Sequence, residues 1–204
     1  MLVDYTQGID LHFNAANFYF NRGNPKSDVG KKEDALVDCN QAIELNPKDA
    51  VAYLNRGLAK SALGQKAEAI ADYDQAIDIE PKLAVAYNNR GNAKSALGKK
   101  TEAIADYTKA IELNYYNSNA YYNRGLTKYS LGEKAEAIAD YSKVIELSYY
   151  NANAYYLRGL AKSDLGKKAE AIADYQKAAD LYKYQGNTSN YEEAVKKVQQ
   201  LSAH

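Results

Sequence analysis

The sequence predicts an all-α fold, a solenoid of stacked helix-turn-helix hairpins, and two observations carry this prediction. The tripeptide Asn-Arg-Gly recurs every 34 residues along a chain of 204 residues. Between its occurrences, apolar residues follow the i, i+3, i+4, i+7 spacing of a helix face. A single hairpin cannot bury such a face alone, so the repeats are expected to stack on one another.

The register of the repeat is strict. The tripeptide begins at Asn21, Asn55, Asn89 and Asn123, and Leu157-Arg-Gly completes the series. A second glycine, an alanine and the residue four positions after that alanine keep the same interval. These are Gly30, Gly64, Gly98, Gly132 and Gly166; Ala35, Ala69, Ala103, Ala137 and Ala171; Cys39, Tyr73, Tyr107, Tyr141 and Tyr175. We predict five units, at 16–49, 50–83, 84–117, 118–151 and 152–185.

Each unit is predicted to contain two helices. In the unit 50–83 the first helix is expected to end at Leu63, because Gly64 adopts a left-handed conformation at little cost. The second helix places Ala69, Tyr73 and Ile77 on one apolar face. Pro81 then prevents the helix from continuing.

This pattern resembles the tetratricopeptide repeat family over nearly the whole chain, and its Asn-Arg-Gly and Ala-Asp-Tyr motifs are similar to those of bacterial members. The large aromatic residue of the family's first helix is matched by Tyr19, Tyr53, Tyr87, Tyr121 and Tyr155. The resemblance implies a right-handed superhelix whose concave groove is lined by the first helices. Two features depart from the family. Cys39 replaces an aromatic residue, and the helix-ending proline of Pro47 and Pro81 becomes Tyr115, Tyr149 and Lys183, where we expect looser turns.

Two further departures from the family occur in every unit. Arginine stands where the family has leucine, and lysine stands one turn later where it has tyrosine. The arginines are Arg22, Arg56, Arg90, Arg124 and Arg158, and the lysines are Lys26, Lys60, Lys94, Lys128 and Lys162. A carboxylate recurs equally strictly in the second helix, at Asp38, Asp72, Asp106, Asp140 and Asp174. We predict a ladder in which each arginine pairs with a carboxylate of a packed helix; a basic stripe for an acidic ligand is the alternative.

The two ends of the chain differ from the units between them. Residues 1–15 match the second helix of a unit, so they are interpreted as a half-repeat that caps the array or continues a longer one. Pro25 is expected to kink the first helix of the first unit and make that unit the least stable. Residues 186–204 predict a closing helix with a capping box from Ser189 to Glu192. Its apolar stripe is Tyr191, Ala194, Val195, Val198 and Leu201.

The resemblance also implies a site, because family members hold peptides in the concave groove. The residues expected to line it here are Asn21, Asn55, Asn88, Asn89, Asn92, Asn119, Tyr122, Asn123, Tyr129 and Tyr156. Leu54 and Asn153 are expected on the same surface. Asparagine both donates and accepts hydrogen bonds, so the amide row could bind a peptide backbone, or it could only tie neighbouring helices together. At the groove positions where chaperone-binding members carry the cations that grip a terminal carboxylate, this chain has asparagine and apolar residues instead, so an acidic C-terminal tail is not the expected ligand.

Composition argues against several classes of function. Twenty-six basic residues balance 26 acidic ones, which disfavours a nucleic-acid partner. No apolar run is long enough to span a membrane, and no secretory signal is readable, so the expected location is the cytoplasm. Cys39 and two histidines provide no plausible metal site or catalytic set, so neither a cofactor nor an enzyme is predicted.

The predicted function is therefore a protein-interaction scaffold that binds a peptide segment of a partner. The alternatives are self-association, through the orphan N-terminal helix or through turns rich in the chain's 20 tyrosines, and a fragment of a longer array.

Overall fold

The structure is a computed structural model that describes residues 29–203, and all regular elements in this range are α-helices. The chain divides into two compact units, Met1–Leu113 and Asn114–His204. The predicted half-repeat at 1–15, the kink at Pro25 and the groove residue Asn21 lie outside the described residues.

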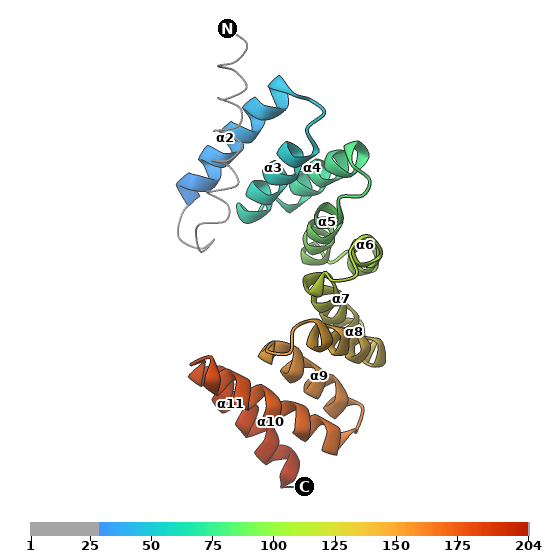
Figure 1. Cartoon of the computed structure of the whole chain (residues 1–204), viewed down its shortest axis with the longest axis vertical. Helices are drawn as coiled ribbons and strands as arrows, with labels where there is room; N and C mark the ends of the chain where they lie inside the picture. The colour runs from blue at the N-terminus through green and yellow to red at the C-terminus, as the bar shows by residue number, and fades with distance from the viewer. Residues whose placement is uncertain (1–28, 204) are drawn as a thin grey trace. The chain divides into compact units, whose positions relative to one another are not determined.

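The first unit holds helices α2 to α6. Their bounds are α2 (Val29–Leu45), α3 (Ala50–Ala62), α4 (Lys66–Ile79), α5 (Ala84–Ala96) and α6 (Lys100–Leu113). Helix α3 packs against α2 and α4, and α5 packs against α4 and α6 (Figure 1). Helices α3 and α5, the first helices of two successive hairpins, also touch.

The second unit continues the same pattern with helices α7 to α11. Their bounds are α7 (Ser118–Ser130), α8 (Lys134–Leu147), α9 (Ala152–Asp164), α10 (Lys168–Tyr184) and α11 (Thr188–Ser202). Helix α8 packs against α7 and α9, and α10 packs against α9 and α11. The prediction of an all-α helical-repeat fold is confirmed.

Glycine ends the first helix of a hairpin, as predicted. Gly64 has a φ angle of +86°. The N–H groups of Gly64 and Gln65 donate to the carbonyls of Ser61 and Lys60 at 3.2 and 2.9 Å. This is the Schellman pattern, which satisfies carbonyls that the helix itself leaves unpaired.

The turns that have tyrosine in place of proline are closed by the same backbone hydrogen bond as the Pro81 turn. In the Pro81 turn the N–H of Leu83 donates to Glu80 O at 3.1 Å, and the Tyr115 turn forms the same bond from Asn117 to Asn114 O at 3.0 Å. The Asn117 side chain also accepts a hydrogen bond from the N–H of Ala120 at 3.1 Å. An asparagine N-cap therefore fixes the start of the next helix where proline is missing.

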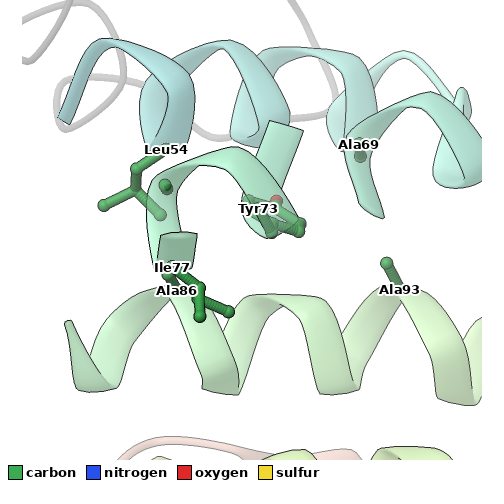
Figure 2. Close-up of a cluster of buried hydrophobic side chains, with 7 residues drawn as sticks. Leu54, Ala69, Tyr73, Ile77, Ala86 and Ala93 are labelled. Carbon is green, nitrogen blue, oxygen red and sulfur yellow. The ribbon is translucent and has the colours of Figure 1, made fainter. Parts of the chain in front are cut away.

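The core is built from small residues around one buried tyrosine per hairpin. Figure 2 shows Tyr73 with Leu54, Ile77 and the alanines of α4 and α5. A Cβ atom on Gly57 would lie 2.6 Å from the Tyr73 ring, so only glycine lets the two helices of the hairpin approach so closely. Leu54, expected in the groove, is only 7% exposed and belongs to this core.

The closing helix α11 begins earlier than the sequence suggested. Its N-cap is Asn187, whose side chain accepts from the N–H of Asn190 at 3.2 Å, so the predicted capping box at Ser189 is wrong. Asparagine at least equals serine as a cap, which favours the earlier start. The apolar stripe is confirmed: Ala194 is fully buried, and Tyr191 and Val195 pack on the cluster that contains Tyr182.

Candidate functional site

The recurrent charges form a buried ladder. Asp72 is 3% exposed and accepts hydrogen bonds from Arg56 Nη2 at 2.6 Å and Nε at 3.1 Å. Lys60 Nζ lies 2.7 Å from the other carboxylate oxygen. The same triad recurs as Arg90, Lys94 and Asp106; Arg124, Lys128 and Asp140; Arg158, Lys162 and Asp174. The predicted arginine–aspartate ladder is confirmed in these four units, and the lysine is a second partner that was not predicted. Arg22 and Lys26 of the first predicted unit lie outside the described residues.

Within each unit, arginines of the ladder also connect neighbouring hairpins, as Arg56 and Arg90 do in the first unit and Arg158, through Ser142, does in the second. Arg56 Nη1 donates to Asn40 Oδ1 at 2.8 Å, and Arg90 Nη1 donates to Asp74 Oδ1 at 2.6 Å. The Arg56 guanidinium lies 5.4 Å from the centre of the Tyr53 ring, within range of a cation–π interaction. Because these cations are engaged inside the fold, the structure favours the structural interpretation over a basic stripe for an acidic ligand.

The predicted amide row is not uniform. Asn55 and Asn88 are buried, with 7% and 8% of their surface exposed, whereas Asn89 is half-buried and Asn92 is exposed. Asn92 Oδ1 accepts a hydrogen bond from the Tyr107 hydroxyl at 2.9 Å. In the first unit, the surface available to a ligand is therefore centred on Asn89 and Asn92.

In the second unit Asn119 is exposed and Asn123 is half-buried. Two predicted tyrosines there donate hydrogen bonds to carboxylates of neighbouring helices: Tyr129 to Asp164 Oδ2 at 2.6 Å, and Tyr156 to Glu193 Oε1 at 2.5 Å. Burial, followed by the hydrogen bond to Asp164, raises the pKa of Tyr129 to about 12. Its phenol is therefore a neutral donor at physiological pH.

Three predicted residues, Tyr122, Asn153 and Tyr156, meet in an open pocket of about 160 Å³ within the second unit. The complete lining is Tyr122, Asn153, Tyr156, Leu157, Tyr182, Asn190 and Glu193, contributed by α7, α9, α10 and α11. The Tyr182 hydroxyl donates to Asn153 Oδ1 at 2.6 Å and fixes that amide in the wall.

Leu157, Tyr182, Asn190 and Glu193 line the pocket but are not among the residues predicted for the site. Asn190 and Glu193 lie on the closing helix α11, which is not part of the 34-residue repeat, so comparing the repeats with one another could not identify them. The available signal was the apolar stripe of α11, because a helix that docks through one face brings its flanking polar residues to the edge of the contact.

Metal or thiol chemistry receives no support from the described residues. Among residues 29–203 no group of three or more His, Cys, Asp or Glu side chains is arranged to hold a metal ion. Cys39 is buried, and burial raises the pKa of its thiol to about 11, which suppresses the reactive thiolate. None of the described helices is long and apolar enough to cross a membrane.

Sequence models of the tetratricopeptide repeat match residues 10–49, 50–83, 84–114, 118–148 and 152–185. The chain belongs to the tetratricopeptide repeat family. A search of the curated proteins gave no match.

Solved tetratricopeptide repeat structures resemble this chain. A crystal structure of MamA is 27% identical with a TM-score of 0.73, covering 77% of this chain and 92% of its own. YrrB, described as a TPR protein with an unusual peptide-binding site, is 23% identical with a TM-score of 0.64, covering 80% and 91%. The first TPR of Spaghetti (RPAP3), bound to the HSP90 peptide SRMEEVD, is 30% identical with a TM-score of 0.56, covering 57% and 93%.

Proposed function

We propose that this tetratricopeptide repeat protein is an interaction scaffold that binds a peptide segment of a partner on the surface lined by its first helices. The observation that carries the proposal is the set of half-buried and exposed amide and phenol groups on α7 and α9 of the second unit, none of which belongs to the charge ladder. Such groups contact a peptide backbone without requiring a charged ligand.

The comparison with Spaghetti supports the same proposal. That protein binds a short peptide of HSP90 and is 30% identical to this chain. Its peptide is acidic, whereas the arginines and lysines of this chain are engaged with buried aspartates. We therefore expect a different ligand class for this chain.

Selection from a random peptide library, with the full chain as bait, tests the proposal. The variant Asn119→Ala with Asn123→Ala removes two amides of helix α7 and is expected to raise the Kd of the selected peptides roughly tenfold. The matched control, Gln75→Ala with Gln176→Ala, removes two exposed amides of second helices and should leave binding unchanged. Failure to enrich any peptide would contradict the proposal.

Self-association is a second candidate, favoured by exposed tyrosines of the second unit. Tyr116, Tyr150 and Tyr184 occupy the same place in successive repeats and are 78%, 66% and 83% exposed. Tyrosine buries a large area at low entropic cost, so such residues are enriched at interfaces. If they hold two copies together, light scattering will show a mass that rises with concentration, and Tyr116→Ser with Tyr150→Ser will abolish the rise.

An enzymatic role is not proposed. Tetratricopeptide repeat proteins are generally scaffolds, and the repeated carboxylates of this chain are ion-paired inside the fold.

A further inference from the structure

The pocket of the second unit, between Tyr122, Tyr156, Tyr182 and Glu193, has the dimensions of a single side chain. Its volume is about 160 Å³. An engineered protein cavity of about 150 Å³ accepts benzene, so a pocket of this size holds one large side chain but no folded element. Tyr122 and Tyr156 are half-buried and Glu193 is exposed, so the pocket opens onto the surface.

The polar groups of the pocket are suited to a donor. The hydroxyl protons of Tyr156 and Tyr182 are already directed at Glu193 Oε1 and Asn153 Oδ1. The carboxylate of Glu193 keeps acceptor capacity beyond this one bond, since an ionised carboxylate accepts at both oxygens. A ligand group that only donates hydrogen bonds therefore fits this wall better than an anion.

The charges around the pocket also favour a cationic ligand group. Glu193 is the only charged residue of the lining and forms no ion pair with any described residue. The phenol rings around it present faces that attract cations. The ring of Tyr175 lies 5.3 Å from that of Tyr156. Burial first, then Asp164, then Tyr129 and last Glu193 raise the pKa of Tyr175 to about 12.

One cation, Lys197, lies on the same side of α11 and partly offsets the negative charges of Glu193 and Asp164. Lys197 is one turn beyond Glu193, and it acts on Asp164, whose pKa is lowered first by the Tyr129 hydrogen bond and further by Lys134 and Lys197. Lys134 forms the ion pair with Asp164, at 3.3 Å, while Glu193 is left without a cation among the described residues.

We propose that this pocket receives the arginine or lysine side chain of the bound peptide, with the cationic group against the Glu193 carboxylate and the tyrosine faces. The proposal rests on the peptide-binding function proposed above and names the ligand's chemical class. Arginine and lysine carry only donors, which matches the free acceptor of the wall.

The experiment uses the full chain and the peptides selected from the random library. We expect a basic residue at one fixed position of the enriched peptides. In the tightest-binding peptide that carries an arginine there, that arginine is replaced by the isosteric, neutral citrulline. We expect the Kd, measured by fluorescence anisotropy, to rise roughly tenfold. Lysine peptides are tested with norleucine instead.

Glu193→Gln is expected to raise the Kd of the arginine peptide by a similar factor and to make the arginine and citrulline peptides nearly equal. Glu192→Gln is the matched control, because Glu192 is exposed on the same helix and does not line the pocket. Circular dichroism establishes that each variant is folded.

The two proposals fail in different ways. The proposed basic side chain would be overturned if the enriched peptides share no basic residue. It would also be overturned if Kd changes neither when citrulline replaces the arginine nor in the Glu193→Gln variant. In both cases the peptide-binding proposal would still stand. A selection that enriches no peptide would overturn both.

Discussion

Asp106 illustrates what the charge ladder does at the scale of a residue. Its carboxylate is 5% exposed and is shared between Arg90 and Lys94, both mostly buried. Without Asp106, Arg90 would keep only Asp74 and Lys94 only Glu102, and both of these carboxylates are largely exposed. Losing the buried partner of two mostly buried cations costs more than the intact group contributes. The ladder therefore makes each hairpin intolerant of losing its aspartate.

Asp106→Asn is expected to destabilise the first unit by roughly 2 kcal/mol, because Arg90 and Lys94 lose their buried carboxylate and keep only the exposed Asp74 and Glu102 as partners. Glu112→Gln is the matched control on the same helix: its partner Lys109 is exposed, so the expected loss is below about 0.5 kcal/mol. Urea denaturation followed by circular dichroism measures both. Equal losses would show that the buried ladder adds no stability beyond a surface ion pair.

The buried tyrosines of successive hairpins differ in one hydrogen bond. The Tyr107 hydroxyl donates to Asn92, whereas the Tyr141 hydroxyl is buried with no hydrogen-bond partner among the described residues. The difference arises because the residue equivalent to Asn92 in the next repeat is Leu126.

Tyr141→Phe is expected to leave the protein as stable as before or to stabilise it by about 1 kcal/mol, because it removes a buried hydroxyl that has no partner. Tyr107→Phe should destabilise by roughly 1 kcal/mol, since it deletes a hydrogen bond. Thermal melting of the two variants gives the comparison. A larger loss for Tyr141→Phe than for Tyr107→Phe would contradict the assigned partners.

At the scale of the helix hairpin, the glycine of the first helix sets how closely the second helix approaches. A Cβ atom would lie 2.6 Å from the ring of Tyr73 at Gly57, but 3.2 Å from the ring of Tyr175 at Gly159. The same repeat position is thus packed most tightly in one hairpin and less tightly in another.

Gly57→Ala is therefore expected to destabilise its hairpin, because Tyr73 is 1% exposed and has little room to move. Gly159→Ala should cost roughly 1 kcal/mol less or be neutral, since the higher helix propensity of alanine offsets the milder contact. Hydrogen exchange read separately in α3–α4 and α9–α10 reports each hairpin. Identical changes would show that the spacing differences carry no energy.

At the scale of the whole molecule, the repeat ends on a helix that differs from it. Helix α11 closes the second unit by covering a cluster that includes Leu181, Tyr182 and Ala194. Solenoids need such an end because the last hairpin otherwise exposes the face that every other hairpin buries. The same helix completes the pocket with Asn190 and Glu193.

Ala194→Asp is expected to undock α11, because it places a charge at a site that is 0% exposed. An isolated helix of this length is marginal in water, so residues 188–202 should lose protection in hydrogen exchange. Gln200→Asp, at an exposed position of α11, serves as the control and should keep the protection. Retained protection in Ala194→Asp would mean that α11 does not depend on this contact.

Much of the fold could be predicted from the sequence, because it is carried by local spacing. Helix faces, the left-handed glycine at Gly64 and the pairing of arginine with aspartate all recur at a fixed interval, and each has a local physical cause. The stripe of α11 was equally readable, since apolar residues on one face of a helix must be buried.

Only the tertiary structure decided which of these residues meet and which remain accessible. Asn55 and Leu54 occupy predicted groove positions but are buried, because the neighbouring helices cover them. Tyr156 and Glu193 are 37 residues apart and meet only when α11 docks. Exposure and long-range contact depend on how helices pack, and a periodic sequence comparison carries no information about a helix outside the repeat.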